Sequence, residues 1–561
     1  MAIAQMNCTV GDLAGNVSRI VEFAGRAREQ GATLMLTPEL ALCGYPPEDL
    51  LLRDDFYRSC DAALQQLAAQ IDGITLVVGH PHHVNGRRFN AASVVANGRI
   101  TATYHKHSLP NYTVFDEQRY FDSGGEPCVF EASGVKFGIN ICEDTWSRQG
   151  PLLANPGAIG KDLKLGVANS AELREATAPR AARAAGAEVL LVLNASPYHL
   201  RKQHTRYDVM RERVKETGMP LIYANMIGGQ DELVFDGASF ALDRAGRIAH
   251  QLPLFEEALA IVTIEDGEVH AGELAPENSL EAEVYDALCL GVRDYVTKNA
   301  FPGVLLGLSG GIDSALTLAI AADALGAGKV HAVMMPSQYT ASMSLEDARA
   351  EATTLGVRYS EIAIKPIYDT FMSALEHEFR GLAADTTEEN LQSRVRGTLL
   401  MAMSNKSGSI VLTTGNKSEM GTGYATLYGD MAGGFAVLKD ISKMLVYRLA
   451  NYRNLGTAVI PQRVITRAPS AELRPDQTDQ DSLPPYDVLD AIMEAYVEHN
   501  LGPREIEARG YLRKDIERVI GLLRISEYKR RQAPIGIRIT PRGFGKDWRY
   551  PITNKYRHQF G

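Results

Sequence analysis

The stretch G-V-L-L-G-L-S-G-G-I-D-S-A-L-T-L-A-I-A-A-D-A-L-G, residues 303–326, decides the fold of the second half of the chain. It begins as a short apolar run that ends in glycines and continues as a mostly apolar stretch with helical character. A buried strand that passes through a glycine-rich turn into a helix is typical of doubly wound α/β sheets. The runs at 331–337 and 409–416 are two more candidate buried strands, again separated by helices. We therefore expect a doubly wound parallel sheet here.

The first half of the chain alternates apolar runs with amphipathic helices. Five runs rich in Val, Ile and Leu are predicted to be buried strands, at 33–40, 74–80, 136–144, 188–196 and 221–228. Turn signals predict three β-hairpins, centred on Asn97-Gly98, Ala245-Gly246 and Asp266-Gly267. Strand-rich layers with flanking helices indicate an α/β sandwich.

Composition places the chain among ordinary globular proteins and excludes several classes. Of its 561 residues, 45% are hydrophobic and 22% are charged, and the formal net charge is −10. An acidic chain is a poor candidate for non-specific binding of nucleic acid or of an anionic membrane, so neither is an expected partner. Six cysteines without a C-x-x-C pair, no signal-peptide pattern and no apolar run of about 18 residues predict a cytoplasmic location.

The organisation predicted is an N-terminal domain at 1–265, a linker at 266–280 and a C-terminal domain at 281–561. A helix is expected from Ser279 to about Lys298. A Gly- and Ala-rich stretch at 147–184 is long for a connection, and is expected to be a surface excursion or an interface element.

Three candidate catalytic residues of the first half each lie at the end of a predicted strand. Cys142 ends one in G-I-N-I-C-E-D-T-W, Glu39 another in L-T-P-E-L, and Lys106 follows Y-H in a third. A cysteine attacks as the thiolate, so it needs a base and a nearby cation. A carboxylate can take the thiol proton, and an ammonium can stabilise the thiolate and the later oxyanion. Taken singly, a cysteine in an apolar strand is more often an inert core residue.

The contexts of these residues are more specific than the residues themselves. T-P-E-L with G-Y-P-P-E-D-L-L, then K-H-S-L-P-N-Y with F-D-E, then N-I-C-E-D-T-W resemble, in this order, the nitrilase superfamily of carbon–nitrogen hydrolases. The resemblance covers about residues 1–265 and implies an α-β-β-α sandwich. It implies Glu39 as general base, Lys106 as oxyanion stabiliser, Cys142 as nucleophile and Glu117 as a supporting glutamate.

One branch of that superfamily has a glutamine-recognition segment that N-A-S-P-Y-H-L-R-K-Q-H-T-R, residues 194–206, resembles. The resemblance implies Ser196 and Lys202 as glutamine-binding residues, with Tyr112 at the pocket. The alternative for Ser196-Pro197 is an ordinary turn.

The histidines of G-H-P-H-H-V, at 80, 82 and 83, raise the alternative of a zinc site. No Asp, Glu or Cys at ligand spacing joins them in the sequence, and a turn between the strand and Pro81 explains them without a metal.

The glycine-rich loop of the second half is a candidate phosphate site. Glycines let backbone N–H groups approach phosphate closely, and the N-terminus of the following helix adds a favourable dipole. The loop lacks the lysine of a Walker A motif. The string S-G-G-I-D-S resembles the pyrophosphate-binding loop of the ATP-pyrophosphatase family, whose members adenylate a substrate oxygen and share an adenine nucleotide alpha hydrolase-like fold. The ATP-binding residues implied are Gly307, Leu308, Ser309, Gly310, Gly311, Ile312, Asp313 and Ser314.

Further motifs at 388–397, 411–430, 437–450, 479–490 and 527–534 resemble the NAD⁺ synthetases, over about residues 280–561. The resemblance implies further binding residues: Thr414 and Lys443 for ATP, Asn390, Glu419 and Lys529 for deamido-NAD⁺, and Asp313 with Glu419 for Mg²⁺. Leu427 stands where ammonia-dependent relatives carry a lysine in T-K-Y-G-D, which agrees with the glutamine-dependent branch.

Together the two halves predict a glutaminase that supplies ammonia to an adenylating synthetase. The small molecules expected are glutamine, ATP and deamido-NAD⁺, with Mg²⁺, and the resemblance implies a homo-oligomer, a dimer or higher. Two alternatives remain open. One is an amidotransferase of the same adenylating group that aminates a nucleotide base or a transfer RNA. The other is a non-catalytic nucleotide sensor with a degenerate amidase domain.

Overall fold

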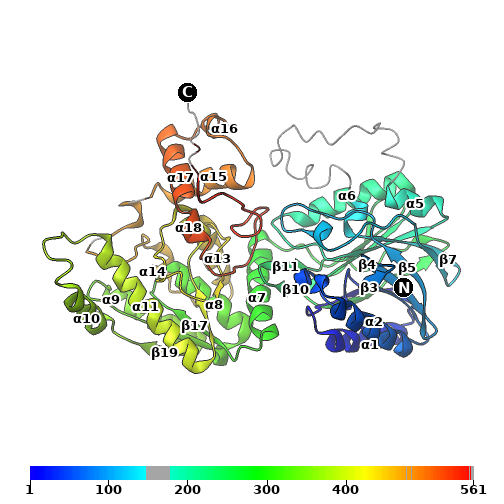
Figure 1. Ribbon diagram of the computed structural model, residues 1–561, viewed down its shortest axis with the longest axis horizontal. Helices are drawn as coiled ribbons and strands as arrows, with labels where there is room; N and C mark the ends of the chain where they lie inside the picture. The colour runs from blue at the N-terminus through cyan, green and yellow to red at the C-terminus, as the bar shows by residue number, and fades with distance from the viewer. Residues whose placement is uncertain (147–176, 476, 482, 555, 557–561) are drawn as a thin grey trace. The chain divides into compact units, whose positions relative to one another are not determined.

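The computed structural model describes residues 1–146, 177–475, 477–481, 483–554 and 556. The chain divides into two compact units, Met1–Asn278 and Ser279–Gly561 (Figure 1). Most of the stretch 147–184, expected to be an excursion or an interface element, lies outside the described residues. Its last part forms helix α5 (Ala178–Ala184).

The first unit contains two six-stranded mixed sheets. The first sheet has the order β14 (Ala258–Ile261), β1 (Ala2–Gln5), β2 (Leu34–Leu36), β3 (Thr75–Val84), β4 (Arg87–Ala96), β5 (Arg99–His105). The second has the order β13 (Ile248–Gln251), β12 (Phe240–Leu242), β9 (Leu221–Asn225), β8 (Val189–Asn194), β7 (Val135–Ile141), β6 (Val129–Ala132). The described part of this unit also contains two short antiparallel pairs: β10 (Ile227–Gln230) with β11 (Leu233–Asp236), and β15 (Ile264–Glu265) with β16 (Glu268–Val269).

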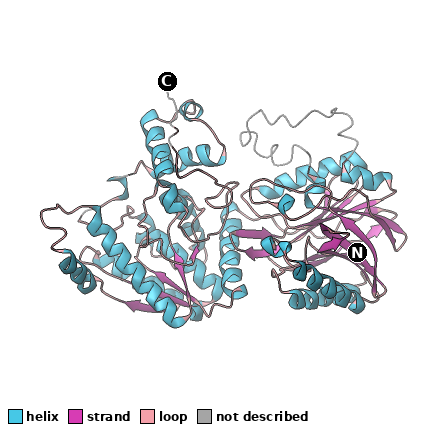
Figure 2. Cartoon of the chain, viewed as in Figure 1, coloured by secondary structure: helices cyan, strands magenta, loops and turns pink. Residues whose placement is uncertain are grey.

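The sheets pack face to face, with helices on their outer faces (Figure 2). Successive side chains of a strand point to opposite faces, and the first sheet shows this directly. Leu34 and Leu36 enter the apolar core between the sheets, whereas Met35 packs with the core under α1 (Leu13–Glu29) and α2 (Asp54–Gln70). Helix α6 (Lys202–Thr217) and α5 cover the second sheet through a third cluster. This is the α-β-β-α sandwich that the sequence predicted.

Three details of the first unit differ from the sequence-based expectations. The strand predicted at 33–40 ends at Leu36, so Glu39 lies in the turn that follows it. No turn occurs at Pro81. Strand β3 continues through Pro81 to Val84. Strand β2 pairs only with the first residues of β3, so at Pro81 the β2 side of β3 needs no backbone N–H donor for strand pairing. The hairpin expected around Asp266-Gly267 is confined to β15 and β16, since the preceding strand β14 pairs with β1 instead.

The other two predicted hairpins are confirmed. Strands β4 and β5 pair antiparallel across Asn97-Gly98, where both residues have positive φ. Strands β12 and β13 pair antiparallel on either side of Ala245-Gly246. Strand β1, which the sequence analysis did not identify, joins β2 and β14 inside the first sheet.

The second unit is built on a five-stranded sheet in which every pairing is parallel, as the sequence predicted. Its order is β19 (Arg358–Glu361), β18 (Val330–Met334), β17 (Val304–Gly307), β20 (Ile410–Thr413), β21 (Phe435–Ala436). The α-helices of this unit are α7 (Leu280–Lys298), α8 (Ile312–Leu325), α9 (Ser342–Leu355), α10 (Lys365–Leu375), α11 (Thr386–Ser407), α12 (Lys417–Thr422), α13 (Lys443–Arg453), α14 (Gln462–Thr466), α15 (Tyr486–Met493), α16 (Pro503–Glu507), α17 (Arg513–Ile525) and α18 (Glu527–Arg530).

The junction between the units falls within the region expected to be a linker. Strand β16 lies inside 266–280, and the Ala275 amide donates to the Gln251 carbonyl of the first unit (2.9 Å). Helix α7 begins where expected, because the Ser279 side chain accepts a hydrogen bond from the Ala282 amide and caps it.

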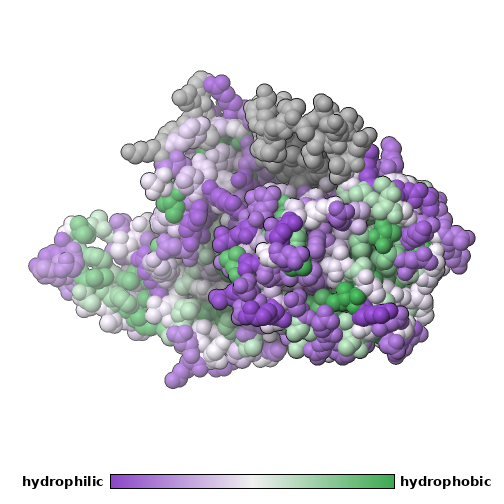
Figure 3. Space-filling view, turned by 45° about the vertical axis from the view of Figure 1, so that its right-hand side comes forward, coloured by the Kyte–Doolittle hydropathy of each residue, from purple (hydrophilic) through white to green (hydrophobic). Residues whose placement is uncertain are grey.

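The surface view in Figure 3 shows hydrophilic residues with small apolar areas between them. Among the described residues, no helix is both long and apolar enough to span a membrane.

Candidate active sites

The turn that follows β7 holds Cys142 in an uncommon backbone conformation. Cys142 opens a short 3-10 turn, Cys142–Thr145, with φ of 43°, and its side chain is buried. A left-handed conformation at a non-glycine residue is strained and is often found at functional sites. The Thr145 hydroxyl donates to the Cys142 carbonyl (2.8 Å) and braces the turn.

A buried cluster of charges lies beside this cysteine. The Lys106 ammonium donates to Glu39 Oε1 (2.7 Å) and to both carboxylate oxygens of Glu117 (2.8 Å each). Lys106 is 0% exposed and Glu39 is 1% exposed. One cation between two buried carboxylates leaves the cluster with a net negative charge, so its geometry depends on further hydrogen bonds.

Those further hydrogen bonds come from residues that the sequence analysis missed. The Asn90 amide group of β4 donates to Glu39 Oε1 (2.7 Å), and the Tyr45 hydroxyl donates to Glu117 Oε1 (2.9 Å). The backbone N–H of Ala195, at the end of β8, donates to Glu39 Oε2 (3.0 Å). No sequence motif singles out Asn90, because the strand that carries it also contains Arg87, Arg88 and Ser93.

A glycine lets the turn that carries Glu39 approach β3. A Cβ atom at Gly79 would lie 2.5 Å from the Leu40 amide nitrogen, so no larger residue fits without moving the turn. Leu40 itself has φ of 48°. The close approach of the turn backbone to β3 at Gly79 therefore fixes the position of Glu39 relative to the first sheet.

Electrostatics makes Cys142 a thiol that needs a base. Burial raises the pKa of Cys142 well above its usual range, and the nearby Glu39 carboxylate adds to the rise while Lys106 opposes it. Burial alone would lower the pKa of Lys106, but Glu117 and Glu39 hold that pKa well above its usual range. The site therefore combines a protonated thiol, a carboxylate acceptor and a fixed ammonium.

The three residues expected to bind glutamine occupy two places. The Tyr112 hydroxyl donates to Glu143 Oε2 (2.7 Å), next to the cysteine in the chain. Ser196 lies in the turn after β8, and Lys202, the first residue of α6, donates from its ammonium to the Pro197 carbonyl of that turn (2.9 Å). Buried Arg206 braces this turn by donating to the Ser196 carbonyl (2.8 Å) and pairing with Asp236.

Glu143 should make the stability of the first unit depend on pH. Burial raises its pKa from 4.5 to about 7. The folded state therefore binds the proton more tightly than the unfolded state, and folding loses free energy as the pH rises through that window. The full penalty is about 3 kcal/mol above pH 7. We expect Glu143→Gln to raise the unfolding temperature of the first unit at pH 8 and to change it little at pH 5.

The matched control is Glu131→Gln, at an exposed position of β6. Its unfolding temperature, followed by calorimetry over the same pH range, should track that of the unmodified protein. The prediction would be contradicted if the difference in unfolding temperature between Glu143→Gln and the unmodified protein did not change with pH.

The histidines at 80, 82 and 83 all lie in the second half of β3. His80 Nε2 lies 2.7 Å from Ser93 Oγ, and His82 Nδ1 lies 2.9 Å from His105 Nε2. Burial lowers the pKa of His80 to about 3, so that imidazole is neutral in the folded protein. Among the described residues, no group of three or more His, Cys, Asp or Glu side chains is placed to hold a metal ion.

In the second unit, the loop between β17 and α8 has the features of a phosphate site. Gly310 has φ of +75°, and a Cβ there would lie 2.4 Å from the Ser344 carbonyl oxygen. The Ser309 hydroxyl accepts from the Gly311 amide (3.2 Å), and the Ser314 hydroxyl donates to the Gly311 carbonyl (2.9 Å). These contacts hold the loop so that it meets the N-terminus of α8, where anions are favoured.

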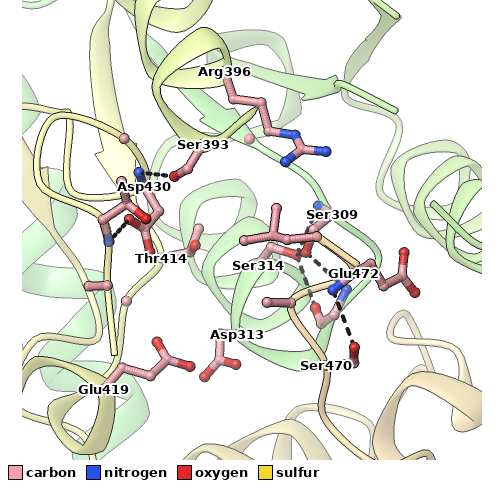
Figure 4. A pocket seen from close by; sticks show the side chains of 18 of the residues that line it. Ser309, Asp313, Ser314, Ser393, Arg396, Thr414, Glu419, Asp430, Ser470 and Glu472 are labelled. Carbon is pink, nitrogen blue, oxygen red and sulfur yellow. Dashed lines mark hydrogen bonds between the residues drawn. The ribbon is translucent and has the colours of Figure 1, made fainter. Parts of the chain in front are cut away.

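Two carboxylates expected to share a metal lie together beside this loop. Figure 4 shows the Asp313 and Glu419 side chains directed toward each other. The Lys443 ammonium pairs with Asp313 and lies 3.6 Å from Glu419 Oε1. The Asn416 side chain, which the sequence analysis missed, donates to Asp313 Oδ1 (2.8 Å). Burial and the Asp313 charge raise the pKa of Glu419 to about 8, and Lys443 opposes that rise.

A single cavity of about 630 Å³ brings the predicted residues of this unit together. Its walls include Thr414, Asn390 and Lys529 in addition to the loop and the carboxylates. The Lys529 ammonium donates to the Gly423 and Ala425 carbonyls (2.8 and 2.7 Å). Of the predicted ATP-binding loop, Gly310 alone is not among the residues that line the cavity, and its carbonyl accepts from the Arg467 guanidinium (2.6 Å).

The cavity also exposes Arg396, which sequence reasoning missed. Its guanidinium points into the cavity from α11 (Figure 4), while its Nε donates to the Met335 carbonyl (3.0 Å). Burial lowers the pKa of Arg396 to about 10. The motif at 388–397 also contains the exposed Arg394, and nothing in the sequence indicates which of the two arginines faces inward.

Comparison with known proteins assigns both units. Residues 284–533 match the NAD synthase family model, and residues 1–159 and 151–271 match the carbon-nitrogen hydrolase model. A curated glutamine-dependent NAD⁺ synthetase of Acinetobacter baylyi is 48% identical over 562 residues, spanning 99% of this chain and 98% of that protein. The chain belongs to the glutamine-dependent NAD⁺ synthetases.

Solved structures of this family have the same two-part fold. The glutamine-dependent NAD⁺ synthetase of Acinetobacter baumannii, solved in complex with ADP, is 44% identical, with a TM-score of 0.75 over 99% of this chain and 98% of that one. That of Cytophaga hutchinsonii shares the fold at 20% identity, with a TM-score of 0.81 over 99% of this chain and 97% of that one. The expected assignment to a glutamine-dependent NAD⁺ synthetase is therefore confirmed.

Proposed function

We propose that this chain converts ATP, deamido-NAD⁺, glutamine and water into AMP, pyrophosphate, NAD⁺ and glutamate. The first unit releases ammonia from glutamine, and the second unit adenylates deamido-NAD⁺ and amidates it with that ammonia. One observation carries the proposal: the same chain contains two different sites. The first unit has the buried Lys106–Glu39–Glu117 cluster beside Cys142, and the second has a cavity of about 630 Å³ lined by the glycine-rich loop.

In the first unit, each residue of the cluster supports one step of amide hydrolysis. Glu39 takes the thiol proton of Cys142 as the sulfur attacks the amide carbon, and the Lys106 ammonium stabilises the oxyanion that forms. The proton then passes to the leaving nitrogen, ammonia departs and a thioester remains. Water, deprotonated by Glu39, cleaves the thioester to give glutamate and the free thiol. Glu117 holds Lys106 in place by accepting from it with both carboxylate oxygens.

In the second unit, the chemistry begins with a poor electrophile. A carboxylate does not form an amide with ammonia readily, because oxide is a poor leaving group. Its oxygen therefore attacks the α-phosphorus of ATP, and pyrophosphate leaves. Ammonia then attacks the acyl adenylate and AMP departs. The loop from Gly307 to Ser314, with Thr414 and Lys443, is proposed to hold the triphosphate.

The residues present fit a magnesium ion. Mg²⁺ is usually held by one or two carboxylates together with substrate phosphates, and Asp313 and Glu419 offer two carboxylates at the edge of the phosphate loop. When bound, the metal would neutralise phosphate charge, while Lys443 keeps the two carboxylates in position.

Asn390, Glu419 and Lys529 are proposed to bind deamido-NAD⁺. Asn390 accepts from the Thr426 hydroxyl (2.8 Å), and Lys529 is bonded to the carbonyls of Gly423 and Ala425. Both side chains therefore hold the turn 423–430 at the cavity wall, and a ligand seated there would contact them together.

Lys529→Ala should raise the KM for deamido-NAD⁺ by about tenfold and leave the KM for ATP within about twofold. Loss of one charge-assisted contact has about that effect. Steady-state assays that vary each substrate separately measure it. The matched control is Lys514→Ala, at an exposed position of α17. A rise in the KM for ATP alone would move Lys529 to the ATP side of the cavity.

The working location proposed is the cytoplasm, and the working form is a homo-oligomer, a dimer or higher. Free thiols at Cys43, Cys60, Cys128 and Cys289 support a reducing compartment. The oligomer is implied by the family resemblance, and sedimentation of the purified chain tests it.

Product analysis tests the overall reaction directly. Purified protein with ATP, Mg²⁺, glutamine and deamido-NAD⁺ should yield NAD⁺, AMP and glutamate in equal amounts. Formation of ADP in place of AMP would exclude adenylation. Release of glutamate without any NAD⁺ would leave the acceptor unidentified, and other carboxylates would then replace deamido-NAD⁺ in the assay.

A further inference from the structure

Asp144 is a buried carboxylate two residues beyond Cys142, and the steps proposed above do not use it. It is 4% exposed. Its Oδ1 atom accepts from the backbone amides of His107 (2.9 Å) and Ser108 (2.8 Å). Its Oδ2 atom accepts from the Ile141 amide (2.9 Å) and from the Tyr104 hydroxyl (2.8 Å). With four donors on two oxygens, neither oxygen is available to exchange a proton with substrate.

The partners of Asp144 flank two catalytic candidates. Tyr104 precedes Lys106, and His107 follows it, at the end of β5. Ile141 is the last residue of β7, immediately before Cys142. One carboxylate therefore bonds to the backbone on both sides of the junction between the lysine segment and the cysteine turn.

The sheet topology makes this junction important. Strand β5 lies at the edge of the first sheet, whereas β7 lies in the second, and no pairing between the described strands joins the two sheets. A second link runs from Lys106 through Glu39 to the Ala195 amide at the end of β8, but it does not reach the cysteine turn itself. Hydrogen bonds to a charged acceptor are shorter and more directional than packing contacts, so they fix a distance that the sheets do not.

The backbone of the cysteine turn needs the same support. Cys142 has φ of 43°, a conformation that persists only where the surroundings determine it. The bond from the Ile141 amide to Asp144 fixes the residue just before this position.

We propose that Asp144 is a positioning residue of the glutaminase site, which sets the Lys106 ammonium at its working distance from Cys142. The inference rests on the proposed function, because it assumes that this pair cleaves glutamine. Asp144 does not touch the substrate. It acts through the two segments that carry the reacting groups.

Asp144→Asn is the sharpest test, because it keeps the size of the side chain. An amide replaces one acceptor oxygen by an NH₂ group, which then faces two donors whichever way it turns. We expect kcat for glutamine hydrolysis to fall by about 10²-fold, since a displacement of about 1 Å at a reacting pair has that effect. The KM for glutamine should stay within about threefold.

A second measurement separates positioning from general destabilisation. The rate of alkylation of Cys142 by iodoacetamide, followed against pH, reports the thiolate population. If Lys106 is displaced, the profile should move to higher pH in Asp144→Asn. Ammonia-driven NAD⁺ synthesis by the same protein should be unchanged, which shows that the second unit is folded.

Tyr104→Phe provides a milder variant in case Asp144→Asn does not fold. It removes one of the four donors, so kcat should fall by about threefold to tenfold with a smaller shift of the same profile. The matched control is Tyr120→Phe, whose hydroxyl bonds to Asp49 at the surface (2.9 Å). That variant should match the unmodified protein in both measurements.

The proposal is overturned if kcat of folded Asp144→Asn stays within about threefold of the unmodified protein. It is also overturned if kcat falls while the alkylation profile stays in place, or if KM rises at constant kcat. If Asp144→Asn does not fold, an unchanged kcat and profile in Tyr104→Phe overturn it. An unmodified protein that does not hydrolyse glutamine contradicts the proposed function instead.

Discussion

Cys142→Ala should lose glutamine-driven NAD⁺ synthesis by at least about 10⁴-fold while keeping synthesis driven by ammonium salts. Without the sulfur no thioester forms, and loss of a nucleophile removes nearly all of the rate that depends on it. Free ammonia enters the reaction after glutamine hydrolysis, so the second unit should work at its usual rate. Parallel assays of glutamate and NAD⁺ with each nitrogen source measure both effects.

The structure explains why Cys142→Ala disturbs the fold less than a substitution of Lys106. Removing Lys106 would leave Glu39 and Glu117 as two buried carboxylates without their cation, which costs about 3–5 kcal/mol of stability. Cys142→Ala removes one small side chain. The matched control is Cys128→Ala, at a half-buried cysteine of the same unit. Substantial glutamine-driven synthesis by Cys142→Ala would overturn the thiol-amidase assignment, and loss of both activities would overturn the separation into two sites.

Asp313→Asn should give the reciprocal result. Synthesis with either nitrogen source should fall by roughly 10²–10³-fold, because a group that stabilises charge in the transition state is lost. The change also weakens the contact that holds Lys443. Glutamine hydrolysis in the first unit should continue. Release of AMP and of glutamate, measured in the same reaction, separates the two outcomes.

The control for this variant lies on the same helix. Asp323 of α8 pairs with Arg453 (3.0 Å) and is not among the residues that line the cavity. Asp323→Asn should therefore change AMP release by less than about threefold. Normal AMP release by Asp313→Asn would show that this carboxylate does not serve the phosphate site.

The catalytic candidates of the first unit were predictable because each lies where a predicted strand ends. The sequence placed Glu39, Lys106 and Cys142 at three such ends, and the resemblance named their roles. It did not indicate Asn90, Asp144 or the Ala195 amide. These residues act through contacts with segments distant in the chain, such as the bond between Ala195 and Glu39, and local patterns carry no record of such contacts.

The second unit shows the same division. The glycine-rich loop and the parallel sheet were predictable from 303–326, because a strand, a turn and a helix follow one another there. The inward orientation of Arg396 and the bond from Asn416 to Asp313 were not. Each depends on how α11 and α12 pack against the sheet.

The sequence by itself determined the fold class and most of the buried strands and helices, because the periodicity of apolar residues and the turn signals act over a few residues. It also indicated which reactive groups the protein has, because the motifs around Cys142, Lys106 and Asp313 resemble those of particular enzyme families. The tertiary structure alone decided which groups form ion pairs and hydrogen bonds with one another. Those pairings join residues far apart in the chain, and burial gives them their strength by removing the water that would otherwise screen them.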